Sequence, residues 1–188
     1  MGKGEHQRYA IGLAASSDGI HWEKRPEPVF EGRSGWENYN AGTVAVLKVD
    51  NEYWMYYTGY PVTNLGLATS PDGITWTRKS NTILVPNQDW EQTGVGYTTV
   101  LHENGTFKML YMNNESHPKF GYAISSDGIH WLKSDANPIF TKEDVINDWG
   151  SYCIAYPSLT KIGNEYRIYY TGTANSSYAW AIGYASLK

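Results

Sequence analysis

Three aspartates stand at the same place in a repeated segment, and they are the first candidates for acid–base chemistry. The segment reads Ser-Ser-Asp-Gly-Ile-His-Trp at residues 16–22 and 125–131, and Ser-Pro-Asp-Gly-Ile-Thr-Trp at 70–76. A carboxylate can transfer protons, but an Asp before Gly can also accept backbone N–H bonds across its own turn while the Gly adopts a positive φ. Threefold repetition at one turn favours the structural role. We therefore predict that three acids fasten turns: Asp18, Asp72 and Asp127.

The other reactive side chains form no recognisable catalytic or metal-binding pattern. Two histidines, His21 and His130, share one position of the repeat, which favours a structural role. The other three lack the spacing of metal ligands: His6, His102 and His117. Cys153 is the single cysteine, which excludes an internal disulfide, and no histidine base lies near it in the sequence. The sequence predicts no metal and no cofactor.

The elements that position these residues are read from the spacing of the repeat. The segment recurs about every 55 residues, a period typical of stacked or radial units. Each unit reads as four strands, the last beginning at the tryptophan of the segment, and Pro28 and Pro138 fall in this last strand. Proline is tolerated there only at a sheet edge. The pattern predicts an all-β fold, a β-propeller of four-stranded antiparallel blades with about three blades per chain.

The predicted blades divide the chain into four units within one domain that spans residues 1–188. The ranges are a partial blade at 9–30, two full blades at 40–86 and 95–140, and a second partial blade at 153–188. We expect the tryptophan of each repeated segment to pack against the neighbouring blade: Trp22, Trp76 and Trp131.

Composition excludes several classes of protein. The net charge is −4, and charged residues make up 18% of the chain without forming blocks, so the sequence has no basic surface for nucleic acid and no segment typical of a membrane surface. No apolar run approaches the roughly 20 residues that a membrane helix needs. Residues 1–9 lack the apolar core of a secretion signal, so we expect a cytoplasmic protein by default. The 16 tyrosines and 8 tryptophans suit half-buried strands and also sugar-stacking surfaces.

The repeated segment, preceded by Tyr-Tyr-Thr-Gly at residues 56–59, resembles the blades of the five-bladed glycoside hydrolase superfamily. This group contains family 43 arabinofuranosidases and xylosidases, family 32 fructosidases and the related mannoside phosphorylases. The sialidase Asp-box is a second relative, but it has one more residue between Asp and Gly. The resemblance covers residues 9–188 and implies a propeller whose catalytic carboxylates stand at the start of innermost strands.

The matching positions of this chain carry no acid. The family places its catalytic carboxylates several residues after a tryptophan, and the matching tryptophans here are Trp36, Trp90 and Trp149. A count of seven residues from each reaches Thr43, Tyr97 and Tyr156. Glycoside cleavage generally needs two carboxyl groups, one on each side of the scissile bond. The nearest acids are Glu37 and Glu91, directly after their tryptophans, and Asp89 and Asp148, directly before theirs. The simpler interpretation of all four is that they are solvated on loops.

The predicted units do not close a ring. Five blades of this length would need about 270 residues, and propellers have at least four blades. The last strand of the chain also occupies the blade position that residues 10–14 would otherwise fill. Because an open arc exposes sheet edges, we expect a homodimer that completes one ring, or a fragment of a longer hydrolase.

Three functions stay open. The first is a carbohydrate-binding or degenerate glycoside-hydrolase-like propeller. The second is an active glycosidase (furanosidase- or xylosidase-like) that uses acids such as Glu37 and Glu91 or a site completed by a second subunit. The third is a structural platform for protein partners. For the first, we predict that aromatic and amide side chains line a central funnel and bind sugar: Trp36, Tyr39, Asn40, Trp90, Tyr97, Trp149, Tyr152 and Tyr156.

Overall fold

The computed structural model describes residues 8–61, 63–146, 148–176 and 179–186. The described chain contains no α-helix and is built from antiparallel strands with three short 3₁₀ turns, which confirms the all-β prediction. Residues 1–7, on which most of the argument about a secretion signal rests, lie outside the described residues. No helix in the described part of the chain is long and apolar enough to cross a membrane.

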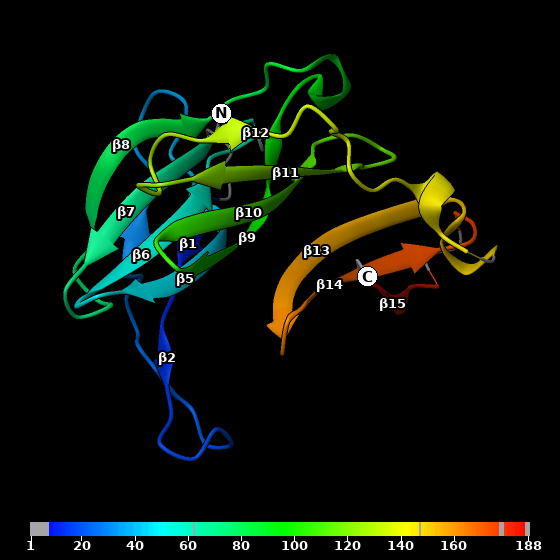
Figure 1. Ribbon diagram of the computed structural model, residues 1–188. Helices are drawn as coiled ribbons and strands as arrows, with labels where there is room; N and C mark the ends of the chain where they lie inside the picture. The colour runs from blue at the N-terminus through cyan, green and yellow to red at the C-terminus, as the bar shows by residue number, and fades with distance from the viewer. Residues whose placement is uncertain (1–7, 62, 147, 177–178, 187–188) are drawn as a thin grey trace, which may run out of the picture.

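Three sheets form the body of the molecule (Figure 1). The first sheet has the order β5-β6-β7-β8, the second β12-β11-β10-β9 and the third β13-β14-β15. Their strands are β5 (Gly42–Val49), β6 (Glu52–Thr58), β7 (Leu65–Ser70), β8 (Thr77–Leu84), β9 (Val95–Glu103), β10 (Thr106–Asn113), β11 (Phe120–Ser125), β12 (Leu132–Lys133), β13 (Cys153–Ile162), β14 (Glu165–Thr173) and β15 (Ala181–Ser186). Neighbours in each sheet are neighbours in sequence, as the blade interpretation predicts.

A separate ribbon precedes the three sheets; its outer end projects away from the body in Figure 1, whereas Phe30 at its base is buried against Met55 and Tyr57 of the first sheet. In it β1 (Ala10–Ile11) pairs with β4 (Phe30–Glu31), and β2 (Ala14–Ala15) pairs with β3 (Glu23–Lys24). The 3₁₀ turns are η1 (Asp89–Glu91), η2 (Lys142–Asp144) and η3 (Asp148–Gly150). The single-domain assignment and its unit boundaries stay predictions.

The hydrophobic core lies between the sheets. The first strand of each sheet contacts the first strand of the next, so β5, β9 and β13 line one side of the body. One buried cluster joins the first and second sheets through residues such as Tyr56, Leu67, Phe107 and Met109. A second cluster joins the second and third sheets through Phe120, Phe140, Ile154 and Tyr170.

The repeated turns have the predicted fastening role. In the turn at residues 125–131, Asp127 Oδ1 accepts the backbone N–H groups of Ile129 and His130 at 2.9 and 2.8 Å. Gly128 has φ +72°, and the other two turns repeat this geometry with φ +75° at Gly19 and +73° at Gly73. Trp131 packs against Tyr56 of the first sheet as predicted, with ring centroids 5.8 Å apart. The same prediction is wrong for Trp22, which is 57% exposed.

Candidate functional site

The first strands of the three sheets begin in the same unusual conformation. Thr43, Tyr97 and Tyr156 have φ values of +34°, +47° and +53°, and each lies at an irregularity in the pairing of the first strand with the second. Such values are uncommon for residues other than glycine, and strain of this kind gathers at functional sites. These are the three positions that the count from the tryptophans reached.

Two of these residues contact each other across neighbouring sheets. The rings of Tyr97 and Tyr156 meet edge to face with centroids 5.4 Å apart, and the Trp180 ring lies 6.5 Å from that of Tyr156. Tyr156 is 57% exposed. Burial raises the pKa of Tyr97, and the neighbouring Tyr156 and Tyr9 raise it further, so the phenol keeps its proton at neutral pH.

Further aromatic side chains lie at the end of the sheets where β5, β9 and β13 begin. Tyr152 directly precedes β13, Tyr39 lies three residues before β5, and Tyr60 lies two residues after β6; all three are exposed. The rings of Tyr9 and Tyr60 are tilted to each other with centroids 5.7 Å apart, and His117 meets Tyr152 edge to face at 5.1 Å. This end therefore carries a wide aromatic surface.

Asn40 has a structural role beside this surface. Its side-chain oxygen accepts the backbone N–H of Tyr9 at 2.7 Å, and its amide nitrogen donates to the carbonyl of Asn38 at 2.6 Å. The residue is 7% exposed. Because both ends of the amide are engaged, Asn40 fixes the start of the N-terminal ribbon next to the first sheet.

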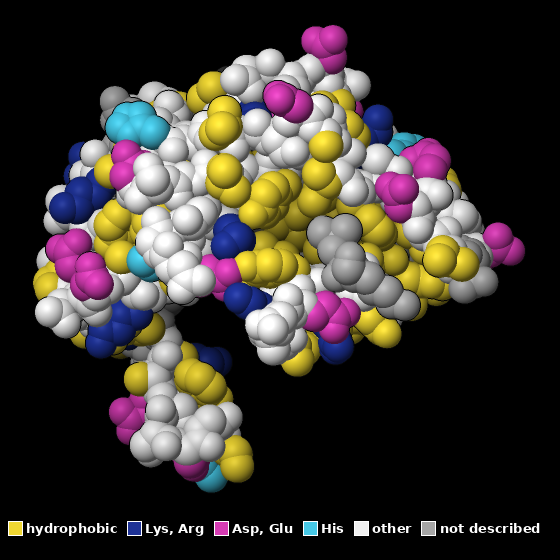
Figure 2. Space-filling view, in the orientation of Figure 1, with side chains coloured by type: hydrophobic (Ala, Val, Ile, Leu, Met, Phe, Trp, Pro, Cys, Tyr) yellow, Lys and Arg dark blue, Asp and Glu magenta, His cyan; other side chains and the backbone are white. Residues whose placement is uncertain are grey.

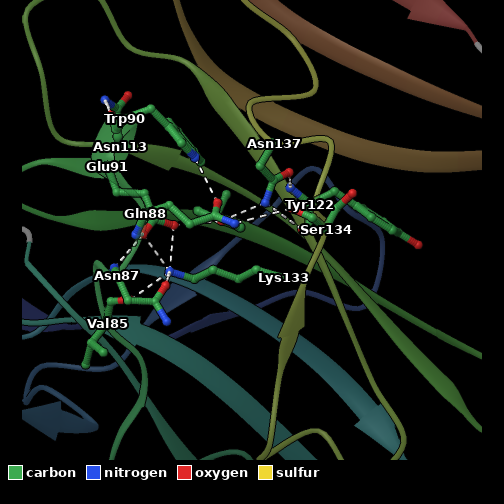
Figure 3. A network of polar contacts seen from close by, with 11 residues as sticks. Val85, Asn87, Gln88, Trp90, Glu91, Asn113, Tyr122, Lys133, Ser134 and Asn137 are labelled. Carbon is green, nitrogen blue, oxygen red and sulfur yellow. Dashed lines mark hydrogen bonds and ion pairs between the residues drawn. The ribbon is translucent and has the colours of Figure 1, made fainter.

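The interpretation of Glu37 and Glu91 as solvated loop acids is wrong. Glu91 is fully buried, and its carboxylate lies 2.6 Å from Nζ of Lys133 on β12 (Figure 3). It also accepts the Tyr111 hydroxyl at 2.8 Å and the backbone N–H groups of Asn87 and Gln88 at 2.7 and 2.9 Å. Burial opposes ionisation, but these donors outweigh it and hold the pKa of Glu91 below its ordinary value.

Glu37 repeats this arrangement in the first sheet. Its two oxygens accept from Nε and Nη2 of Arg78 on β8, both at 2.8 Å, and the Tyr57 hydroxyl donates at 2.6 Å. Burial opposes ionisation here too, yet the Arg78 guanidinium and the Tyr57 hydroxyl lower the pKa of Glu37. Asp89 and Asp148, by contrast, are exposed, as the loop interpretation predicts.

The three tryptophans named for the sugar site pack against the second and third strands of their own sheets. Each stacks on a tyrosine at 5.5–5.8 Å and covers a glycine whose missing Cβ leaves room for the indole. The sets are Trp36 with Tyr57 and Gly66, Trp90 with Tyr111 and Gly121, and Trp149 with Tyr170 and Gly183. These rings brace the sheets away from the central first strands.

The third sheet departs from this pattern at two places at once. Gly150 stands where the first and second units have Glu37 and Glu91, directly after the tryptophan. No fourth strand pairs with β15 among the described residues, so no cation comes from that position either. The buried acid and its cation are thus present together or absent together.

Among the described residues, the site offers phenols, the indole of Trp180 and the imidazole of His117, and no free pair of carboxylates. Glu37 and Glu91 are each neutralised by a cation on their own sheet. The starts of β5, β9 and β13 carry Thr or Tyr, and no group of three or more potential metal ligands occurs in the described ranges. Of the residues predicted for sugar binding, the structure brings Tyr97 and Tyr156 together and places Tyr39 and Tyr152 at the same end.

Sequence reasoning missed four aromatic residues of this end: Tyr9, Tyr60, His117 and Trp180. The Tyr9–Tyr60 contact joins the N-terminal ribbon to the loop after β6, and the His117–Tyr152 contact joins the loop before β11 to the segment before β13. Trp180, before β15, contacts Tyr156. The available signal was position, because Tyr60, His117 and Trp180 lie in loops that connect strands at the end where the first strands begin, and Tyr9 directly precedes β1.

Comparisons with known proteins fit this architecture. A family model described as beta-1,4-mannooligosaccharide phosphorylase matches residues 3–65. A 1,2-beta-oligomannan phosphorylase of Thermoanaerobacter sp. (strain X514) is 28% identical over 93% of this chain and 59% of its own length. A beta-1,2-mannobiose phosphorylase of the same organism is 39% identical over 27% of this chain and 17% of its own. The chain thus spans less than two thirds of the curated relatives that it matches.

Solved structures share the fold at low sequence identity. A glycosyl hydrolase from Bacteroides ovatus superposes with a TM-score of 0.73 and 19% identity, over 96% of this chain and 58% of that chain. The beta-1,2-mannobiose phosphorylase from Listeria innocua superposes with a TM-score of 0.70 and 16% identity, over 95% of this chain and 49% of that chain. A thermostable family-43 glycoside hydrolase superposes with a TM-score of 0.69 and 18% identity, over 95% of this chain and 63% of that chain. The chain has a propeller-type all-β fold and is similar to carbohydrate-active, glycoside-hydrolase-like proteins.

Proposed function

We propose that this chain binds a carbohydrate at the aromatic end of the sheets, with Tyr97 and Tyr156 as the central contact. The observation that carries the proposal is the pair itself, two adjacent phenols from neighbouring first strands in a strained backbone conformation. Aromatic faces stack on the C–H surfaces of sugars, and phenol hydroxyls orient sugar hydroxyls. Tyr39, Tyr152 and Trp180 extend the surface.

The relatives suggest which sugar to test first. The matched family model and both Thermoanaerobacter proteins are named for manno-oligosaccharides with β linkages. We therefore propose a short β-mannoside as the ligand class. Carbohydrate binding without cleavage agrees with the absence of an acid at the starts of β5, β9 and β13.

A titration with β-1,2-mannobiose, followed by calorimetry or by NMR shifts, tests the proposal. Tyr156→Ala should weaken binding about fivefold, because a stacked ring contributes about 1 kcal/mol. Tyr184→Ala is the matched control, since Tyr184 is a similarly exposed tyrosine on β15, away from the starts of the first strands. Equal binding by the native chain and Tyr156→Ala, or no binding of any β-mannoside, contradicts the proposal.

Cleavage is the second candidate, and the names of the relatives favour it. A phosphorylase would release a sugar phosphate from the mannobiose only when inorganic phosphate is present, and a hydrolase would release free mannose without phosphate. If Glu91→Gln abolished such activity in a folded protein, Glu91 would be catalytic despite its ion pair. The role of a protein-binding platform stays an alternative, which a protein partner together with an empty glycan array would favour.

A further inference from the structure

A deep apolar cleft lies between the second and third sheets, with a volume of about 680 Å³. Figure 2 shows hydrophobic side chains gathered in the hollow between these sheets. Asp144 and Ser186 are the polar residues among its lining, together with the tyrosine hydroxyls. The hydroxyl of Tyr166 donates to Glu103 at one end of the cleft, so the remaining wall is chiefly hydrocarbon.

The corresponding place between the first and second sheets is filled by a repeated turn. Residues 125–131 enter that place from the second sheet, and Ile129 and Trp131 pack against the buried cluster. The Tyr56 hydroxyl donates to the carbonyl of Gly128 at 3.1 Å. A Cβ on Gly128 would lie 2.6 Å from the Trp54 ring, so the turn fits tightly.

The pairing registers show that the two places are equivalent. Val100 pairs with Met109 and Met109 with Ala123, just as Leu159 pairs with Ile168 and Ile168 with Ala185. The wall of the cleft therefore repeats the wall that holds the turn. The cleft residues are Leu110, Tyr122, Leu159, Tyr166, Ile168 and Ala185, in the places of Tyr56, Leu67, Val100, Phe107, Met109 and Ala123.

The chain also contains an undocked turn that matches the docked one at every position. Residues 16–22 and 125–131 have the same seven-residue sequence. Both turns make the same internal bonds, including Asp Oδ1 to the backbone N–H two residues on, at 2.8 and 2.9 Å. Yet Ile20 is 76% exposed and Trp22 is 57% exposed, on the ribbon that projects from the body.

We propose that residues 16–22 of one copy of this chain dock in the cleft between the second and third sheets of a second copy. Trp22 then lies against Leu110 and Ile20 is removed from water, and the ribbon that carries the turn approaches from outside the third sheet, because β15 already occupies the third-strand position there. No turn of this chain's described residues fills the cleft. Among its described residues, each copy offers the undocked turn at 16–22 and this cleft, so two copies can exchange turns about a two-fold axis.

Sedimentation velocity or light scattering behind a sizing column tests this exchange, at up to about 100 μM, where even micromolar contacts are occupied. The native chain should associate, and Trp22→Ala should weaken association about tenfold or more, as removal of a buried tryptophan anchor does. Because Trp22 is exposed within its own chain, this change should leave the fold intact, which circular dichroism checks. His21→Thr is the matched control, since the 70–76 turn has Thr75 at this position with the same backbone bonds.

A mixing experiment identifies the two surfaces. Ala185→Glu places a charge in the cleft and leaves the turn intact, whereas Trp22→Ala removes the anchor and leaves the cleft intact. Each variant alone should associate weakly, and an equimolar mixture should regain one contact and form a heterodimer. A purely monomeric native chain overturns the proposal, as does a Trp22→Ala variant that associates like the native chain, or a mixture that stays monomeric.

Discussion

The replacement Lys133→Met tests the buried ion pair of the second sheet. It leaves Glu91 fully buried without its cation and also removes the Lys133 hydrogen bonds to the carbonyl of Val85 and to Asn87 Oδ1, both 2.7 Å. An uncompensated charge in a protein interior costs about 3–5 kcal/mol. We expect the free energy of unfolding at pH 7 to fall by this amount.

Glu91→Gln and the double variant separate charge from packing. Glu91→Gln leaves the Lys133 ammonium with Val85 and Asn87 as acceptors, so it should cost less, about 1–3 kcal/mol. The double variant removes both charges, as the third sheet does with Gly150, and should be more stable than Lys133→Met alone. Its coupling energy should reach about 2 kcal/mol.

Urea unfolding at 25 °C measures these differences in the free energy of unfolding, provided that the m-value is the same for all variants. The pH dependence supplies a second check. Because the folded-state pKa of Glu91 lies below its ordinary value of 4.5, the native chain gains this stabilisation fully above pH 4.5 and loses it as the pH falls through the folded pKa. The cost of Lys133→Met should therefore shrink at acid pH. Additive costs in the double variant, or a pH-independent deficit, would refute the ion-pair argument.

Two further comparisons probe the turns and the contact between sheets. Gly19→Ala adds a methyl group in open space at φ +75° and should lower the free energy of unfolding by about 1–2 kcal/mol through backbone strain. Gly128→Ala, at φ +72°, also meets the Trp54 ring and should cost clearly more in the same urea assay. Equal costs would show that the docked turn is loosely held. Glu103 accepts hydrogen bonds from the Tyr166 hydroxyl and two lysines, which lower its pKa from 4.5 to about 2, so its stabilisation is complete above pH 4.5 and lost as the pH falls through 2. Glu103→Gln should lower the urea midpoint above pH 4.5 and approach the native chain as the pH falls below 2, and parallel pH curves for the two proteins would argue against this contact.

The strand order was predictable because each turn needs particular residues at fixed positions. Asp127 must supply an acceptor and Gly128 must take a positive φ, and these local demands leave a repeat that can be read directly. The environment of that repeat could not be read in the same way. Trp22 and Trp131 end identical seven-residue segments, yet one is exposed and the other packs against Tyr56, because burial depends on which sheet lies opposite.

The burial of the glutamates was hidden for a related reason. Glu91 lies 42 residues from Lys133, and Glu37 lies 41 residues from Arg78. No local sequence pattern near either acid indicates which cation it pairs with, so a solvated loop was the simplest interpretation. The partner comes from the fourth strand of the same sheet, and only the folded sheet brings the two together.

The structure separates a repeated frame from a variable centre. The frame consists of the turns, the stacked tryptophans and the buried ion pairs, and it recurs with nearly the same distances in the first and second sheets. The centre repeats in backbone, because Thr43, Tyr97 and Tyr156 share a positive φ, but the side chain changes from threonine in the first sheet to tyrosine in the other two. Tyr97 is half-buried against the cluster that joins the second and third sheets, whereas Tyr156 is 57% exposed. Packing therefore accounts for part of Tyr97 but for little of Tyr156, and because the proposed sugar contact depends on this pair, Tyr156 is the residue whose removal is most informative.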